Sequence, residues 1–264
     1  MARGLSRFWL WTAPLAVGIA AALLFGTGFV LALRGATGQP LGEPPAPKPM
    51  ATPAAAAKDG VFRILVVGDS LAKGTGDETG KGFAVNVLEA FRKKGPAEIT
   101  NLAVNGMESP EVLSLVESPN VRALAAGARL ILVSVGGNDL SHRFTRGAAP
   151  TDIADAVAES RGRYVQNLRA MLAALREANP SARICVLGLY DPFGGEKGSG
   201  RVGASVILQW NMLIMETALS FPGVTVVPTF DLFQGRPDRL GADHYHPNAQ
   251  AYEEIARRML QVVA

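Results

Sequence analysis

From residue 61 onward, short aliphatic runs alternate with longer stretches in which apolar residues recur every three or four positions. The short runs are rich in Val, Ile and Leu, which is typical of strands buried on both faces. The predicted strands are residues 62–68, 97–104, 129–135, 183–189 and 223–228. The predicted helices between them are residues 83–94, 110–117, 151–178 and 201–220. This alternation predicts a three-layer α/β/α sandwich with a mainly parallel five-stranded sheet.

Two of the helical stretches have a clear apolar face. After Thr151, helical spacing groups Ile153, Val157, Tyr164, Leu168, Met171, Leu172 and Leu175. A last helix is predicted to open at Pro247, a residue type favoured in the first turn. Its buried face would carry Tyr252, Ile255, Ala256, Met259 and Val263.

The N-terminal region has a different pattern. Residues 8–33 contain no charged side chain and follow Arg3 and Arg7. As a helix this stretch would be roughly 39 Å long, more than the ~30 Å hydrocarbon core of a membrane. A cleaved signal peptide usually has a shorter apolar core, of about 7–15 residues. The length therefore predicts an uncleaved transmembrane signal-anchor over residues 1–34, with secretion after signal cleavage as the alternative.

The flanking charges predict the orientation of this anchor. Two arginines precede the apolar stretch and Arg34 follows it, so the N-terminus is expected in the cytoplasm and the rest of the chain outside. Residues 35–59 are rich in Pro and Ala without apolar periodicity, which is typical of a linker. The folded domain is then expected to cover residues 60–264.

Charge and cysteine content exclude some classes of protein. Five basic residues and one acidic residue fall within residues 1–58, so the rest of the chain carries −1 of the total charge of +3. A nearly neutral domain without a basic cluster argues against nucleic-acid binding. The single cysteine, Cys185, lies in an apolar run and is expected to be a buried, inert thiol. No group of His, Asp and Cys has the spacing of metal ligands, and no cofactor is expected.

One strand ends in a residue that could be a nucleophile. The run 62–68 leads directly into Asp69 and Ser70, and ligands of open α/β sheets bind at the carboxyl ends of the strands. A serine at this place becomes a nucleophile when a base, an orienting acid and oxyanion donors surround it. The serine alone is therefore only an indication.

The search for a base is short, because the chain contains three histidines: His142, His244 and His246. The last two lie in the loop 243–247, between the last predicted strand and the last helix. An Asp three residues before a His, as Asp243 is before His246, can accept the imidazole Nδ1 proton and leave Nε2 to accept one from serine. The alternative is a polar loop that caps the following helix.

Two further strand ends offer hydrogen-bond donors. Asn138 follows the run 129–135 within a Gly-Gly-Asn-Asp sequence, and its amide suits a developing oxyanion. Gly106 follows the second predicted strand, where its N–H could face the same crevice. Either sequence could also be an ordinary turn. All these residues fall at carboxyl ends of a parallel sheet, however, and this convergence favours a catalytic site over unrelated turns.

Four sequence blocks, in order, resemble the SGNH hydrolases, also called the GDSL esterase/lipase family. The blocks are Gly68-Asp69-Ser70-Leu71, Gly106 after Asn101-Leu102-Ala103-Val104-Asn105, Gly136-Gly137-Asn138-Asp139, and Asp243-His244-Tyr245-His246-Pro247. The resemblance implies a flavodoxin-like fold and ester hydrolysis. It also implies that Ser70 is the nucleophile, His246 the general base and Asp243 its orienting acid. The oxyanion hole would consist of the Ser70 N–H, the Gly106 N–H and the Asn138 side chain.

The expected substrate is a small-molecule, lipid or acylated-glycan ester, and the expected location is the outer side of a bacterial cytoplasmic membrane, reached through the N-terminal helix. Two alternatives remain. The first is an O-acetylesterase acting on cell-envelope polysaccharide, which would use the same residues. The second is a non-catalytic, membrane-anchored binding protein that retains the fold.

Overall fold

The computed structural model describes residues 12, 15–27, 60–144, 150–192 and 200–263. The chain divides into two units, residues 1–49 and residues 50–264. The second unit contains all the named helices and strands. In order they are β1 (Phe62–Gly68), α2 (Ser70–Lys73), α3 (Gly82–Arg92), β2 (Ala97–Asn101), α4 (Ser109–Glu117), α5 (Pro119–Gly127), β3 (Leu130–Ser134), α6 (Gly137–Phe144), α7 (Pro150–Ala178), β4 (Arg183–Leu187), α8 (Gly200–Leu219), β5 (Val224–Val227), α9 (Phe230–Phe233), the 3₁₀ helix η1 (Pro237–Arg239) and α10 (Ala249–Val263).

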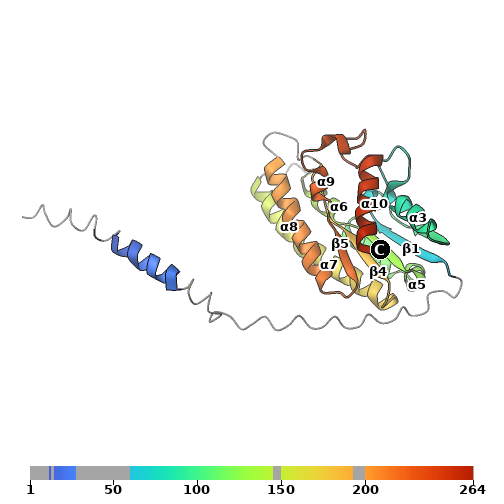
Figure 1. Cartoon of the computed structure of the whole chain (residues 1–264), viewed down its shortest axis with the longest axis horizontal. Coiled ribbons are helices and arrows are strands. Elements are labelled where there is room, and N and C mark those ends of the chain that lie inside the picture. Colours follow the sequence, from blue (N-terminus) through green and yellow to red (C-terminus); the bar gives the residue numbers. More distant parts are fainter. Residues whose placement is uncertain (1–11, 13–14, 28–59, 145–149, 193–199, 264) are drawn as a thin grey trace, which may run out of the picture. The chain divides into compact units, whose positions relative to one another are not determined.

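The five strands form one sheet in the order β2-β1-β3-β4-β5, and every neighbouring pair is parallel. This confirms the predicted α/β class and the parallel sheet. The order is that of flavodoxin-like folds, in which the chain reverses its direction of winding between β1 and β3. Figure 1 shows this sheet between its covering helices.

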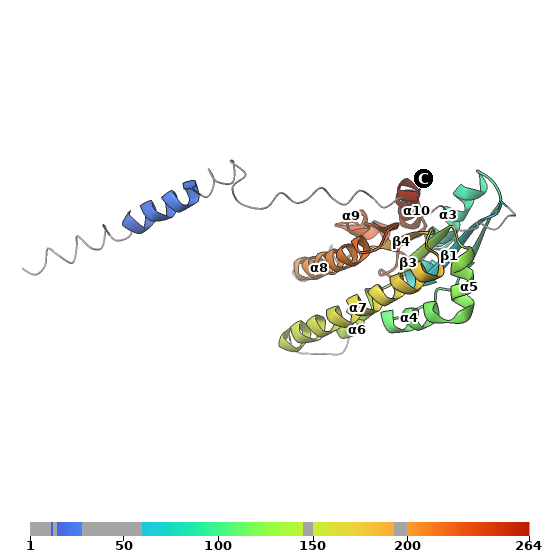
Figure 2. The same ribbon diagram turned by 90° about the horizontal axis from the view of Figure 1, so that it is seen from below.

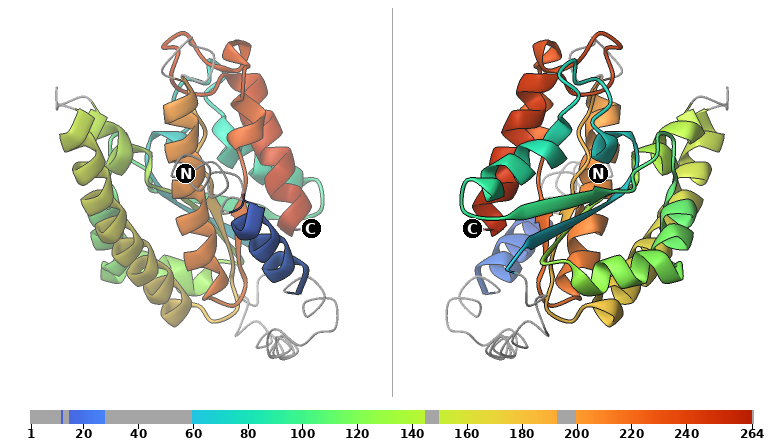
Figure 3. Two further views of the ribbon diagram at one scale, coloured as in Figure 1. Left: turned by 90° about the vertical axis from the view of Figure 1, so that its left-hand side faces the viewer. Right: turned by 90° about the vertical axis from the view of Figure 1, so that its right-hand side faces the viewer.

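Odd-numbered and even-numbered side chains of β1 are buried on opposite faces of the sheet. In β1, Leu65 and Val67 pack with helices α4, α5, α7 and α8, whereas Ile64 and Val66 pack with α3 and α10. Successive side chains of a strand point to opposite faces, so an unbroken apolar run fills both cores. Figure 2 shows α4, α5 and α7 together on one side of the sheet, and Figure 3 shows α3 beside α10 on the other.

The described part of α7 confirms its predicted buried face. In α7, Tyr164, Leu168, Met171, Leu172 and Leu175 are buried, as expected. The predicted burial of Ile153 and Val157 lies outside the described side chains and stays a prediction. The short elements α2, α9 and η1 were not predicted, and neither were helices α5 and α6. Each is short, and the amino-terminal half of α6 is the polar, glycine-containing sequence that resembles a turn.

The predicted start of the last helix was wrong by two residues. Helix α10 begins at Ala249, because Pro247 pairs with Leu240 in an antiparallel bridge instead of entering the first turn. Asn248 caps the helix: its side-chain oxygen accepts the Ala251 N–H at 3.0 Å. The predicted buried face of this helix, from Tyr252 to Val263, is confirmed.

The N-terminal unit contains a helix over residues 15–27. Within the described residues, no helix combines the length and the mean hydropathy that a membrane span requires. The predicted span of residues 8–33 falls partly outside the described residues, and the predicted linker lies outside them completely, so both stay predictions.

Gly68 allows the chain to turn at the end of β1. Gly68 has φ +140°, and a Cβ built on it would lie 2.0 Å from the Ser134 carbonyl oxygen of β3. That carbonyl accepts the Asp69 N–H at 3.1 Å. A side chain at position 68 would therefore separate the ends of β1 and β3, and the residues that follow both strands would move apart.

Candidate active site

The carboxyl edge of the sheet brings together the residues predicted from distant parts of the chain. Ser70 follows β1, Gly106 follows β2 and Asn138 follows β3. Because β1 lies between β2 and β3, these three segments are neighbours. The reversal point between β1 and β3 is where open α/β sheets bind their ligands.

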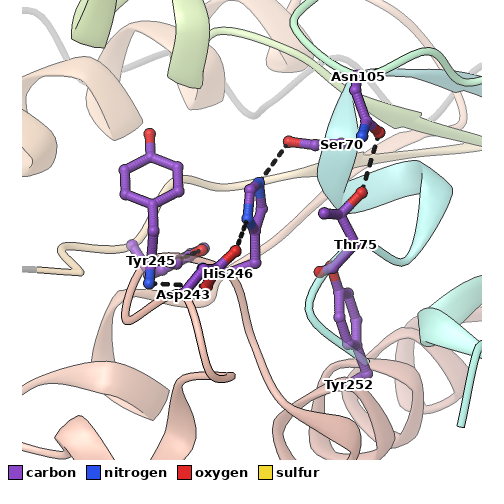
Figure 4. Close-up of polar contacts among 8 residues, drawn as sticks. Ser70, Thr75, Asn105, Asp243, Tyr245, His246 and Tyr252 are labelled. Atoms are coloured by element: carbon purple, nitrogen blue, oxygen red, sulfur yellow. Dashed lines mark hydrogen bonds and ion pairs between the residues drawn. The ribbon is translucent and has the colours of Figure 1, made fainter. Parts of the chain in front are cut away.

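Ser70, His246 and Asp243 form a continuous hydrogen-bonded relay (Figure 4). The His246 Nε2 atom lies 2.9 Å from Ser70 Oγ, and its Nδ1 atom lies 2.6 Å from Asp243 Oδ2. The second oxygen of Asp243 accepts the backbone N–H groups of Tyr245 and His246 at 3.0 and 2.9 Å. The sequence left His244 and His246 open until the family resemblance was considered. In the structure, His246 is the histidine that lies beside Ser70.

The turn geometry explains why the neighbouring histidine takes no part in the relay. His244 has φ +53°, a left-handed conformation that a histidine adopts at some cost. This conformation turns the chain between Asp243 and His246, so the carboxylate reaches back to the imidazole. His244 is therefore a turn residue of this loop.

The charge state of Asp243 results from two opposing effects. Partial burial raises its pKa, but hydrogen bonds from the His246 side chain and from the N–H groups of His246 and Tyr245 lower it more, and the net pKa is below the ordinary value. An ionised Asp243 is able to hold the Nδ1–H tautomer of His246, and this tautomer presents an unprotonated Nε2 to Ser70.

The His246 loop is held against the loop that follows Ser70. Gly76 has φ +91°, and a Cβ there would lie 2.6 Å from His246 Cβ, so only glycine allows this approach. Tyr190, at the end of β4, donates its hydroxyl to the Tyr245 carbonyl at 2.7 Å. From α10, Tyr252 donates its hydroxyl to the Thr75 carbonyl, also at 2.7 Å. These contacts keep His246 at a fixed distance from Ser70.

The ends of β2 and β3 are also tied together. The Asn138 amide donates to the Met107 carbonyl at 2.8 Å, so Asn138 lies against the turn that contains Gly106. Gly106 has φ +83° and is exposed at this turn. Asn138 belongs to the first turn of α6 and not to a loop. The structure thus brings both predicted donors to the edge of the sheet that carries Ser70.

A buried polar cluster behind these donors was not predicted. Asp139 accepts the Ser109 N–H at 2.9 Å and the Ser109 hydroxyl at 2.5 Å, and Asn167 of α7 donates to the same hydroxyl at 3.0 Å. Burial raises the pKa of Asp139, and the hydrogen bonds from Ser109 offset part of that rise. The cluster joins the start of α4 to the start of α6. The sequence signal for Asp139 was its place directly after Asn138.

Asp69 is the second functional candidate that the sequence analysis passed over. It is 2% exposed and caps the short helix α2 by accepting the Leu71 N–H at 3.1 Å. The Ser134 hydroxyl of β3 donates to the same oxygen at 2.7 Å. Burial raises the pKa of Asp69 to about 6, although these hydrogen bonds act in the opposite direction. An aspartate immediately before the first residue of a helix is a common cap, and that was the available signal.

The described part of the chain contains neither a candidate metal site nor a reactive thiol. Across the part of the chain that the structure describes, no three His, Cys, Asp or Glu side chains are grouped so as to hold a metal ion. Cys185 is buried in β4, and burial raises the pKa of its thiol to about 12. Such a thiol is not reactive at neutral pH.

Comparison with known proteins agrees with this geometry. Residues 66–254 match the model of the GDSL-like lipase/acylhydrolase family. The uncharacterized protein YpmR of Bacillus subtilis is 26% identical over 206 residues, which cover 76% of this chain and 80% of that protein.

Two solved structures show the same fold. The lipase Lip_vut3 from a goat rumen metagenome has a TM-score of 0.69 at 23% identity, covering 76% of this chain and 97% of that one. A catalytic mutant of Axe2, an acetylxylan esterase from Geobacillus stearothermophilus, has a TM-score of 0.58 at 17% identity, covering 77% and 94%.

The buried carboxyl group of Asp69 generates a prediction about stability. Its pKa rises from 3.8 to about 6 on folding, so the folded state binds this proton more tightly than the unfolded chain. Protonated Asp69 therefore adds ~3 kcal/mol to the free energy of unfolding. This contribution is fully present below about pH 4 and is lost as the pH rises through about 6. Asp69→Asn should remove this dependence. Urea denaturation of both proteins between about pH 4 and pH 7, followed by circular dichroism, measures it; a constant difference between them over that range contradicts the assignment.

Proposed function

Because the chain belongs to the GDSL-like lipase/acylhydrolase family, we propose that it hydrolyses carboxylic esters through an acyl-enzyme on Ser70. The observation that carries the proposal is the relay from Asp243 through His246 to the Ser70 hydroxyl, with distances of 2.6 and 2.9 Å. A serine hydroxyl is a weak nucleophile by itself, and an adjacent base activates it. The relay supplies both the base and the group that orients it.

The reaction has two steps. In the first, Ser70 Oγ attacks the ester carbonyl carbon while His246 Nε2 takes the hydroxyl proton. The tetrahedral intermediate collapses, the bond to the alcohol oxygen breaks, and His246 returns the proton to the leaving alcohol. In the second, His246 takes a proton from water, the hydroxide attacks the acyl-enzyme, and the acid leaves as Ser70 regains its proton. Asp243 keeps its charge throughout and stabilises the imidazolium that forms in each step.

The negative charge of the tetrahedral intermediate needs donors in place before it forms. We assign this role to the N–H groups of Ser70 and Gly106 and to the Asn138 side chain. An amide nitrogen carries two hydrogens, and the bond to the Met107 carbonyl uses one of those on Asn138. The other hydrogen would serve the oxyanion. The Asp139 cluster supports this arrangement, because it holds the segments that contain Gly106 and Asn138 against each other.

The relay also bears on the alternative of a non-catalytic binding protein. A binding site has no need of an aspartate, a histidine and a serine aligned within hydrogen-bonding distance, nor of a glycine at position 76 to allow that alignment. An O-acetylesterase acting on cell-envelope polysaccharide would use the same relay. It differs from a lipase in what binds beside Ser70, not in the chemistry at Ser70.

We also propose that residues 1–34 anchor the protein in a cytoplasmic membrane, with residues 35–59 as a linker to the catalytic domain outside. The support is the uncharged stretch of residues 8–33 and the arginines that precede it. An anchor of this kind would keep the catalytic domain close to envelope lipids and glycans.

The first prediction concerns Ser70. The full-length protein should be labelled by a fluorophosphonate probe and should hydrolyse p-nitrophenyl acetate, and Ser70→Ala should abolish labelling and lower kcat by at least about 10³. Ser114→Ala, an exposed serine of α4, is the matched control and should be labelled normally. A folded native protein that takes up no probe, or a Ser70→Ala variant that is still labelled, contradicts the assignment.

The second prediction concerns the oxyanion donors. Asn138→Ala should lower kcat for p-nitrophenyl acetate by roughly 10²–10³ with a small change in KM, because the lost hydrogen bond acts mainly in the transition state. Asn120→Ala, an exposed asparagine of α5, provides the comparison. A loss of less than about threefold in Asn138→Ala would remove Asn138 from the oxyanion hole.

The third prediction concerns the anchor. Membranes from bacteria that express the full chain should retain it after an alkaline carbonate wash, and its N-terminal sequence should begin within residues 1–7. Recovery of a soluble form that begins after residue 30 would instead identify a cleaved signal peptide.

A further inference from the structure

We propose that Asn105 and Thr75 form a polar subsite beside Ser70 that binds hydroxyl groups of the alcohol part of the ester. The substrate class would then be esters of polyhydroxy alcohols, such as glycerol or sugars, in preference to esters of hydrocarbon alcohols. The inference rests on the proposed function, because it takes Ser70 as the reacting centre.

Asn105 lies near Ser70 in Figure 4. Asn105 immediately precedes Gly106 at the end of the segment that follows β2, and it is exposed. Its side chain contacts Thr75, which lies just after the helix that Ser70 begins. The Thr75 N–H donates to the Ser70 carbonyl at 3.0 Å. Asn105 is therefore two hydrogen bonds away from the proposed nucleophile.

The hydrogen bond to Thr75 also orients the amide. The Thr75 hydroxyl donates to Asn105 Oδ1 at 2.9 Å, so the amide oxygen turns towards Thr75. In Figure 4 the nitrogen and oxygen of this amide lie side by side, and the nitrogen is nearer to Ser70 in this view. The two hydrogens of this nitrogen are the groups that the subsite offers to a ligand.

Contacts from other elements hold this arrangement in place. The Thr75 carbonyl accepts the hydroxyl of Tyr252, a fully buried residue of α10. Thr75 is therefore fixed by Ser70 on one side and by the last helix on the other, and it holds Asn105 in turn. Donors that are positioned before binding cost a ligand less entropy than donors on a mobile loop.

The chemistry of these donors decides the class of ligand. A neutral amide pairs well with hydroxyl oxygens, and it carries no charge that would select a phosphate or a carboxylate. An alkyl chain over Asn105 would remove water from the amide without replacing its hydrogen bonds, which weakens binding. A polyhydroxy alcohol at the same place restores those bonds. The subsite therefore discriminates between alcohols of equal length.

Two acetate esters test this directly. 1-Monoacetylglycerol and propyl acetate have the same acyl group and a three-carbon alcohol, and they differ in two hydroxyl groups. In Asn105→Ala, kcat/KM for monoacetylglycerol should fall about tenfold more than for propyl acetate, mainly through KM. Thr75→Val, which leaves the amide without its orienting hydroxyl, should show the same selective loss to a smaller extent. Thr75→Ser should restore the native preference.

Three outcomes are decisive, and fluorophosphonate labelling of Ser70 is measured with each variant. An unchanged preference in a labelled Asn105→Ala protein overturns the subsite alone. Equal losses on the two esters also overturn it, because they mean that Asn105 acts through the neighbouring Gly106 and not on the alcohol. A native protein that shows no labelling and hydrolyses neither ester overturns the proposed function, and the subsite with it.

Discussion

The close approach of β1 and β3 at Gly68 and Ser134 is the contact on which the site depends. The two strands run parallel, so their carboxyl ends emerge at the same edge of the sheet. Without a Cβ, Gly68 lets the chain turn directly over the Ser134 carbonyl, and Ser70 follows two residues later. Asn138 follows Ser134, the last residue of β3, by four residues. One backbone contact thus sets the separation between the proposed nucleophile and a proposed oxyanion donor.

Two buried carboxyl groups reinforce this edge and cost stability in doing so. Asp69 joins the start of α2 to β3 through Ser134, and Asp139 joins the start of α6 to the start of α4 through Ser109. Burial raises the pKa of both groups, which shows that the hydrogen bonds only partly replace the lost hydration. Polar networks of this kind fix the relative positions of the segments they join more tightly than apolar contacts would. The Asp69 and Asp139 networks lie directly beneath the site, where they can fix the segments that carry its residues.

The His246 loop reaches the site from the other end of the chain, and packing positions it. Gly76 allows the loop to approach, Tyr190 anchors it through the Tyr245 carbonyl, and the left-handed residue His244 closes the turn. Tyr252 anchors the facing loop, after Ser70, through the Thr75 carbonyl. The relay therefore depends on two tyrosines that lie outside it, Tyr190 after β4 and Tyr252 of α10. Because Tyr252 holds Thr75, the loop that faces His246 and the proposed subsite share one support.

The amino-acid sequence was enough to predict the class of fold, the five strands, helices α3, α4, α7, α8 and α10, and the residues that could carry chemistry. It could do so because buried parallel strands and amphipathic helices have strong local patterns, and because the chain offered few histidines to choose from. Neighbour relations in space lie beyond such patterns. Helix α6 lies in a sequence that resembles a turn. Asp69, Asn105 and Asp139 adjoin predicted site residues, but no local pattern predicted their partners, and Thr75 had no local signal. Their roles depend on partners such as Ser134, Ser109 and Tyr252, and only the tertiary structure brings those partners within hydrogen-bonding distance.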